Sequence, residues 1–215
     1  MKLLRVGNVG DEKPAIIDVD GNYRDLSLIL DDFNPKTLNK DTIKKLKIGN
    51  GMDKDTQLGP LTTEKRLNEI EDLVEKTKQE GAKVLLGGKR PAGFNKGFFY
   101  EPTIFDNVED DFTIMKEEPF GPLVPILSFK NFDEVITRAN NNDLGLCSYI
   151  YTKNLENAHR ASELMETGCV AVNTPVVAVA EAPFGGIKQT GYGREGGSMA
   201  IKDYLNIKYT HLGIK

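Results

Sequence analysis

The sequence lacks what several classes of protein require. Its 32 acidic residues slightly outnumber its 28 basic ones, which gives a formal net charge of -4 at pH 7, and the two signs are mixed along the chain. Proteins that bind nucleic acid or anionic membranes carry a clustered excess of Lys and Arg. No apolar run approaches the roughly 20 residues that span a bilayer, and the first ten residues lack the apolar core of a signal peptide. We therefore expect a cytoplasmic protein with no nucleic-acid or membrane partner.

Cysteine and histidine are also scarce. The chain has two of each, too few for a disulfide framework. Cys147 and Cys169 stand within apolar, strand-like runs, which predicts reduced and buried thiols. Neither His159 nor His211 belongs to a cluster of carboxylates, so we expect no metal site.

The remaining pattern indicates an α/β fold. With 215 residues, of which 39% are hydrophobic, the chain is long enough for one or two domains. Residues 2–30 resemble short strands, and Asp20-Gly21 is a hairpin-turn signal. From about residue 46 onward, helix and strand patterns alternate, which favours a mostly parallel sheet flanked by helices.

Three helices are predicted, at about residues 62–80, 131–139 and 155–166. The first is capped by a Thr, ends at Gly81 and buries a stripe of Leu67, Ile70, Leu73 and Val74. The second starts with a capping box of Asn131 and Glu134, and its expected buried face is Phe132, Val135, Ile136 and Ala139. The predicted strands cover residues 82–88, 98–108, 123–129, 147–152 and 169–173. The tail, 205–214, alternates like an edge strand that pairs with another subunit.

The segment EEPFGP, residues 117–122, places Glu118 two residues before Phe120, at the entry to an apolar run. A carboxylate in such a place can accept hydrogen bonds from ribose hydroxyls while the ring packs on a heterocycle. The alternative, which the residues alone favour, is that Glu118 caps amides in the turn and Phe120 is part of the core.

The segment PFGGIKQTGYGRE, residues 183–195, has four glycines within nine residues. This density predicts positive φ angles or close backbone approach. Lys188 and Arg194 are candidates to hold an anion, although a glycine-rich core turn is the favoured interpretation. The segment is not a GxGxxG dinucleotide fingerprint, because no buried strand leads directly into it and no acidic residue follows at the required distance.

Six sequence segments, taken together, resemble the C-terminal part of the aldehyde dehydrogenase catalytic domain. They are KIGNGMDKDTQLGPL, EGAKVLLGGKR, FFYEPTIFDNV, MKEEPFGPLVPI, GCVAVN and APFGGIKQTGYGREGG, and they span about residues 45–215. Their residues are most similar to those of the succinate-semialdehyde dehydrogenase branch. The resemblance implies that Glu118 binds the nicotinamide ribose of NAD or NADP, that Phe120 contacts the nicotinamide, and that Phe184 lines the substrate tunnel.

The resemblance implies NAD(P)+-dependent oxidation of an aldehyde to an acid through a Cys nucleophile. In the family that Cys ends a glycine-rich segment shortly before the GNG phrase, and no such segment precedes Gly49. The general-base Glu, the oxyanion Asn and the Rossmann domain have no counterpart either, while Cys147 and Cys169 fall at ordinary strand positions. We therefore expect an inactive chain with weak or no cofactor binding. The stretch TPVVAVAEAP also lacks the Ser that semialdehyde specialists use, which counts against succinate semialdehyde.

Residues 1–40 resemble the N-terminal segment of the fumarylacetoacetate hydrolase family, whose metal-binding carboxylates lie in a later domain. The resemblance therefore predicts a chimera, with a hydrolase-like β segment at 1–45 and an aldehyde dehydrogenase part at 46–215. Three functions stay open: an incomplete aldehyde dehydrogenase, a protein that pairs with itself or with an intact aldehyde dehydrogenase subunit, and a hydrolase-type cap module.

Overall fold

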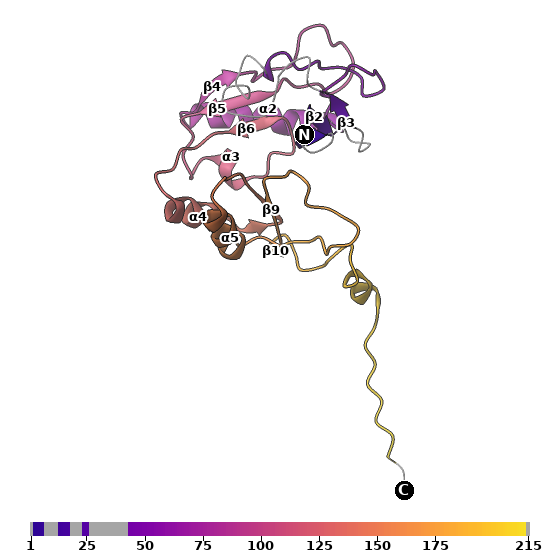
Figure 1. The fold of residues 1–215 in the computed structure, drawn as a ribbon. Helices are drawn as coiled ribbons and strands as arrows, with labels where there is room; N and C mark the ends of the chain where they lie inside the picture. Colours follow the sequence, from indigo (N-terminus) through magenta and orange to yellow (C-terminus); the bar gives the residue numbers. More distant parts are fainter. Residues whose placement is uncertain (1, 7–12, 18–22, 26–42, 214–215) are drawn as a thin grey trace. The chain divides into compact units, whose positions relative to one another are not determined.

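The structure is a computed structural model that describes residues 2–6, 13–17, 23–25 and 43–213 (Figure 1). The chain divides into two compact units, one ending at Ser128 and one beginning at Phe129. The predicted boundary at about residue 45 between a hydrolase-like and a dehydrogenase-like part stays a prediction.

The first unit begins with an antiparallel sheet of three short strands, in the order β1-β2-β3. These are β1 (Lys2–Val6), β2 (Lys13–Ile17) and β3 (Tyr23–Asp25). Ile17 pairs with Tyr23, so β2 and β3 form the expected hairpin. Its predicted turn at Asp20-Gly21 lies outside the described residues, and the resemblance of this segment to the hydrolase family stays a prediction.

Helix α2 (Glu64–Gln79) follows the predicted pattern closely. The Thr63 hydroxyl accepts a hydrogen bond from the Arg66 backbone N–H, which satisfies one of the free amides at the helix start. Gly81 follows the helix with a φ of 114°, a conformation that strongly favours glycine. The four residues of the predicted apolar stripe are all buried. The first helix is therefore confirmed in its cap, its end and its buried face.

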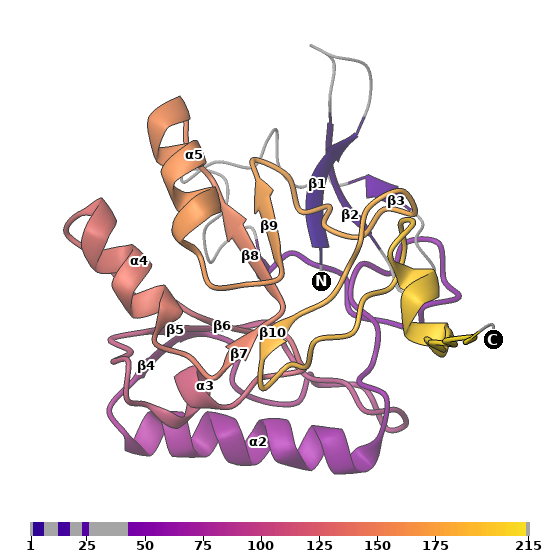
Figure 2. The same ribbon diagram turned by 90° about the horizontal axis from the view of Figure 1, so that it is seen from below.

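Helix α2 lies along one face of a three-stranded sheet in the order β4-β5-β6 (Figure 2). The strands are β4 (Lys83–Leu86), β5 (Thr103–Asp106) and β6 (Leu123–Pro125), and the short helix α3 (Thr113–Lys116) precedes β6. Strand β5 pairs antiparallel with β4 and parallel with β6. Between helix and sheet lies the core, in which the side chains of Val74 and Phe105 have no exposed surface.

The second unit contains two helices and two short two-stranded sheets (Figure 2). Its elements are α4 (Phe132–Asn140), β7 (Leu144–Gly145), β8 (Cys147–Ile150), α5 (Leu155–Leu164), β9 (Cys169–Val172), β10 (Ile187–Lys188) and the 3-10 helix η1 (Ala200–Tyr204). Strands β8 and β9 are parallel, with α5 in the connection between them, whereas β10 and β7 are antiparallel. The α/β class is confirmed, and the sheets combine parallel with antiparallel pairs.

Helix α4 begins as predicted, but its expected buried face is wrong. The Asn131 side chain accepts from the Glu134 N–H, and the Glu134 carboxylate accepts from the Lys130 N–H. No residue of α4 is buried. The Arg160 guanidinium of α5 packs against this helix, with its central carbon 4.4 Å from the centre of the Phe132 ring and one nitrogen 3.0 Å from an Asp133 carboxylate oxygen. The Arg160 cation thus contacts the Phe132 ring, where an apolar side chain was expected.

The tail, expected to be an edge strand that pairs with another subunit, forms no strand within the described residues of the single chain, and its pairing with another subunit stays a prediction. Residues 205–213 follow η1 in no regular element and are exposed. Ile207, Tyr209 and Leu212 keep 101%, 84% and 81% of their surface accessible. A strand exists only where a second strand completes its hydrogen bonds, and alternation in sequence does not supply that partner.

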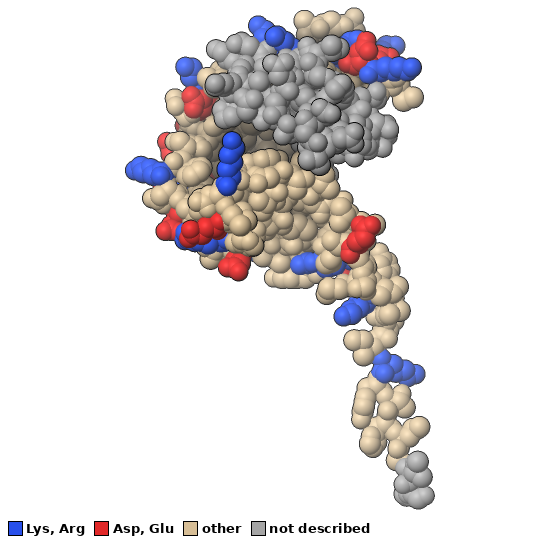
Figure 3. All heavy atoms as spheres, in the orientation of Figure 1, with Lys and Arg blue, Asp and Glu red and all other residues tan. Residues whose placement is uncertain are grey.

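The charges on the face shown in Figure 3 are of mixed sign, as the sequence indicates. Within the described residues, no helix is both long and apolar enough to cross a membrane.

Candidate functional site

The loop of residues 117–122 connects α3 to β6 and is held against α2. A Cβ atom at Gly121 would lie 2.5 Å from the Ile70 Cδ1 atom, so the close approach of the loop to α2 favours glycine here. The Phe120 N–H donates to the Glu118 carbonyl, and the Gly121 N–H donates to the Pro119 carbonyl. The backbone of this loop is therefore tightly bent and anchored in the first unit.

Anchoring the backbone leaves the two predicted cofactor residues at the surface. Phe120 keeps 65% of its surface accessible, and Glu118 is exposed. The alternative in which Phe120 belongs to the core is therefore wrong. The Arg66 guanidinium lies over the Phe120 ring, 6.0 Å from its centre, at the outer limit of a cation–π contact. An exposed carboxylate and an exposed ring in one loop can accept hydrogen bonds from ribose hydroxyls and pack against a heterocycle.

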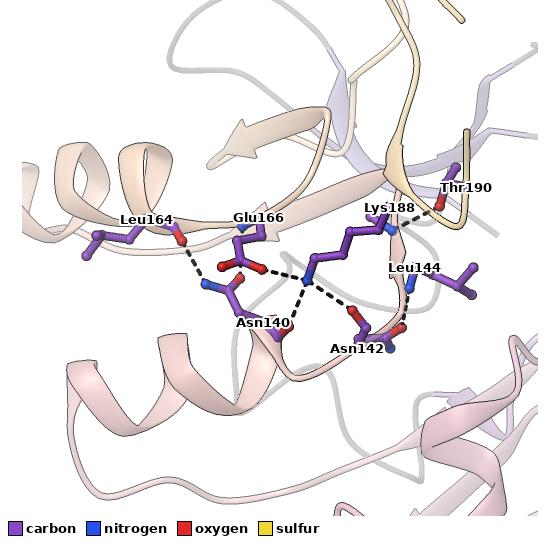
Figure 4. Close-up of polar contacts among 8 residues, drawn as sticks. Asn140, Asn142, Leu144, Leu164, Glu166, Lys188 and Thr190 are labelled. Atoms are coloured by element: carbon purple, nitrogen blue, oxygen red, sulfur yellow. Dashed lines mark hydrogen bonds and ion pairs between the residues drawn. The ribbon is translucent and has the colours of Figure 1, made fainter. Parts of the chain in front are cut away.

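In the glycine-rich segment of the second unit, the Lys188 side chain binds groups of the protein itself (Figure 4). The Lys188 ammonium donates to the backbone carbonyls of Asn140 and Asn142, at 2.8 and 3.0 Å, and lies 2.7 Å from a Glu166 carboxylate oxygen. These three groups come from the end of α4 and the segment after α5. Lys188 itself has a φ of 56°, which is uncommon for a residue with a side chain. Its role is to hold the turn.

Arg194 is used in the same way. One guanidinium nitrogen donates to the carbonyls of Gly186, Tyr192 and Gly193, at 2.7, 3.0 and 3.0 Å. The Arg194 backbone N–H donates to the Asp203 carboxylate at 2.8 Å. Both cations are engaged by groups of the protein, which favours the glycine-rich turn, and anion binding stays a prediction. The favoured interpretation as a glycine-rich turn is confirmed.

Phe184 stands at the start of this segment and is half-buried. Its backbone N–H and carbonyl exchange two hydrogen bonds with those of Glu195, both of 2.7 Å, which closes the segment into a loop. Phe184 lines a cavity of about 380 Å³ together with Leu146, Arg194, Asp203, Tyr204 and neighbouring residues of the glycine-rich segment. The predicted substrate-lining residue therefore borders a cavity within the second unit. Asp203 and Tyr204 were not predicted to lie here, because the sequence pattern did not indicate a helical turn at residues 200–204.

A second cavity of about 510 Å³ opens near the Lys188 turn. It is lined by Asn140, Asn141, Asn142, Asp143, Lys188, Gln189 and Tyr192. Among the described residues, no group of three or more His, Cys, Asp or Glu side chains is placed to hold a metal ion.

The two cysteines lie on neighbouring strands and are half-buried rather than buried as predicted. Both are thiols, as expected. The Cys169 Sγ lies 3.6 Å from the Gly185 carbonyl oxygen. Both occupy the first positions of short strands, β8 and β9, where the strand ends leave part of each side chain accessible.

Comparisons with known proteins identify the family. The family model described as the aldehyde dehydrogenase family matches residues 27–210. The chain belongs to the aldehyde dehydrogenase family. It is 40% identical over 172 residues to the mitochondrial succinate-semialdehyde dehydrogenase of Oryza sativa subsp. japonica, and 41% identical over 172 residues to the NADP(+) succinate-semialdehyde dehydrogenase GabD of Escherichia coli K12. These alignments cover 80% of this chain but only 32% and 35% of those proteins.

Solved structures agree with this membership. An aldehyde dehydrogenase from Bacillus cereus in complex with NAD+ matches with a TM-score of 0.77 at 41% identity, over 82% of this chain and 35% of that one. The succinate-semialdehyde dehydrogenase from Burkholderia pseudomallei matches with a TM-score of 0.75 at 38% identity, over 80% and 35%. The chain therefore spans about a third of the length of the aldehyde dehydrogenases that it resembles.

Proposed function

We propose that this chain carries the nicotinamide-contacting and substrate-lining part of an aldehyde dehydrogenase. The parent reaction is the NAD(P)+-dependent oxidation of an aldehyde, with succinate semialdehyde the leading candidate, to the acid. The observation that carries the proposal is the exposed pair of Glu118 and Phe120 on a loop anchored to α2. Two relatives are named succinate-semialdehyde dehydrogenases, which supports the choice of substrate.

Each proposed residue has a role that suits its environment. The Glu118 carboxylate accepts hydrogen bonds from ribose hydroxyls, and the Phe120 ring packs against the nicotinamide. Phe184 contributes an apolar wall to the path of the aldehyde. When bound, the nicotinamide supplies the acceptor for hydride. The protein groups named here position the reactants and do not themselves form or break bonds.

We further propose that the chain by itself does not turn over an aldehyde. Its two cysteines open the strands β8 and β9, whereas the resemblance implies a nucleophile at the end of a glycine-rich segment before the GNG phrase. The covalent step needs an activated thiolate, and its loss removes the route on which the rate depends. Cofactor affinity is expected to be weak as well, since Glu118 and Phe120 meet only the nicotinamide end.

Ligand-observed NMR tests the proposed contact at weak affinity. With nicotinamide mononucleotide as the probe, we expect saturation transfer from the protein to the nicotinamide protons, and its loss in Phe120→Ala and in Glu118→Ala. Phe129→Ala is a matched control, because Phe129 is also an exposed phenylalanine, at 56%. Transfer that survives in both site variants contradicts the assignment. A dissociation constant for NAD+ in the low micromolar range by calorimetry contradicts the expected weak affinity.

A second function is favoured by the exposed tail. We propose that residues 205–213 pair with a second copy of this chain or with an intact aldehyde dehydrogenase subunit. Ile207 and Tyr209 project apolar surface that has no cover within the described part of the chain, and a strand gains its hydrogen bonds only from a partner. Such a protein acts by association rather than by catalysis.

Light scattering at micromolar concentration measures this association. We expect a mass above the 23.8 kDa of one chain, and a lower mass for the double variant Ile207→Ser, Tyr209→Ser. Lys208→Ser, which lies between the two positions, serves as the control and leaves the mass unchanged. If the chain is a monomer both alone and mixed with an intact aldehyde dehydrogenase, the pairing function is wrong.

A further inference from the structure

The two cysteines face each other across a pair of parallel strands. Cys147 opens β8, Cys169 opens β9, and the two are register partners. Adjacent strands lie about 4.8 Å apart, so the Cα atoms of register partners fall within the range of about 4.4–6.8 Å that a disulfide spans. Side chains of register partners also project from the same face of the sheet. The backbone therefore already has the spacing that a disulfide needs.

A third residue on this face indicates that both thiols are close together. Tyr149 lies two positions after Cys147, on the same side of β8. Its pKa is raised first by burial and then by the nearby groups Cys147, Tyr151 and Cys169. Tyr149 still keeps 46% of its surface accessible, and both cysteines are half-buried. Tyr149 and both cysteines thus keep surface that a small reagent can reach, while Ala171, the register partner of Tyr149, is buried.

We propose that Cys147 and Cys169 form a redox-active dithiol that a low-molecular-weight disulfide oxidises to an intramolecular disulfide. One thiolate attacks the small disulfide, forms a mixed disulfide and releases the first small thiol. The other thiolate then attacks the protein sulfur of the mixed disulfide and releases the second small thiol. The two cysteines lose two protons and two electrons in total, and these reduce one small disulfide to two thiols.

Oxidation also changes a contact to the glycine-rich segment. The Cys169 thiol is positioned to donate to the Gly185 carbonyl at 3.6 Å, and a disulfide sulfur has no proton to donate. Gly185 directly follows Phe184. Oxidation of the two cysteines therefore removes a hydrogen bond to the segment that lines the cavity of about 380 Å³.

Peptide mapping after treatment with glutathione disulfide tests the proposal. Trypsin separates the two cysteines, because Cys147 falls in the peptide 139–153 and Cys169 in the peptide 161–188. We expect these peptides to be recovered as one linked species from monomeric protein, with the loss of two hydrogens from the intact mass and no glutathione retained. Reduction should separate them again.

The matched control moves the first thiol to the other face of β8 by combining Cys147→Ser with Ser148→Cys. Because successive residues of a strand face opposite ways, this variant should retain glutathione on its cysteines and give no linked peptide. Retained glutathione without a link in the unmodified chain overturns the proposal. So does a lack of reaction, a link found only in covalent dimers, or an equal yield of linked peptide from the control.

Discussion

The contacts of Lys188 make a quantitative prediction about the stability of the second unit. Lys188→Met keeps the aliphatic stem and removes the ammonium that serves two carbonyls and Glu166. A hydrogen bond from a charged donor contributes about 1.5–3 kcal/mol when well shielded. The Lys188 side chain is 24% exposed and that of Glu166 is 57% exposed, so solvent screening reduces both hydrogen bonds and leaves the ion pair a minor part. We expect a total loss of about 2 kcal/mol.

Urea unfolding followed by circular dichroism measures this loss. For a urea dependence of about 2 kcal/mol per molar, the midpoint should fall by about 1 M. Lys208→Met is the control, because Lys208 lies in the exposed tail. A midpoint for Lys188→Met that equals the control would refute the idea that the ammonium holds the turn together.

Three further outcomes are expected from urea midpoints. Burial raises the pKa of Tyr100, with a further contribution from Glu71, so the phenol of the unfolded state loses its proton at a lower pH than that of the folded state. The free energy of unfolding should therefore fall above about pH 10, and Tyr100→Phe should reduce that fall. An unchanged pH profile in the variant rejects the assignment. The hydrogen bonds from Arg90, together with its charge, lower the pKa of Glu71. The contribution of the Glu71 carboxylate to stability is therefore present at neutral pH and is lost as the pH falls below the ordinary pKa of 4.5. Glu71→Gln should weaken this loss of stability in acid, and an equally steep loss in the variant argues against the assignment. Gly168→Ala places a Cβ 1.9 Å from the Gly185 oxygen and should cost about 2 kcal/mol or more, while Gly213→Ala, with no atom within 4 Å, should cost little; equal effects contradict the close packing.

Helix α2 was predictable because local signals and tertiary packing agree there. The same residues that form the apolar stripe are buried in the core, and Thr63 and Gly81 define the helix ends by their own chemistry. The caps of α4 were predictable for the same reason. Its buried face was not, since burial depends on what packs against a helix, and Arg160 comes from a segment distant in the sequence.

The two predicted loops show the same limit. Glycine density correctly indicated a tight turn at residues 183–195, but it did not reveal that Lys188 and Arg194 bind backbone carbonyls of the protein. For Phe120, residue type alone favoured the core, but the ring is exposed on a loop whose Gly121 packs against Ile70 of α2. The tail alternates like a strand, but residues 205–213 form no strand in the single chain, because a strand needs a second strand to complete its hydrogen bonds.

We propose that this member of the aldehyde dehydrogenase family holds reactants but does not perform the covalent step by itself. The most direct test is NAD(P)H formation by the purified chain, with succinate semialdehyde and with either NAD+ or NADP+. We expect a rate equal to that of a heat-treated control, and the same rate for Cys147→Ser and Cys169→Ser. A rate above the control that either cysteine substitution abolishes would contradict it.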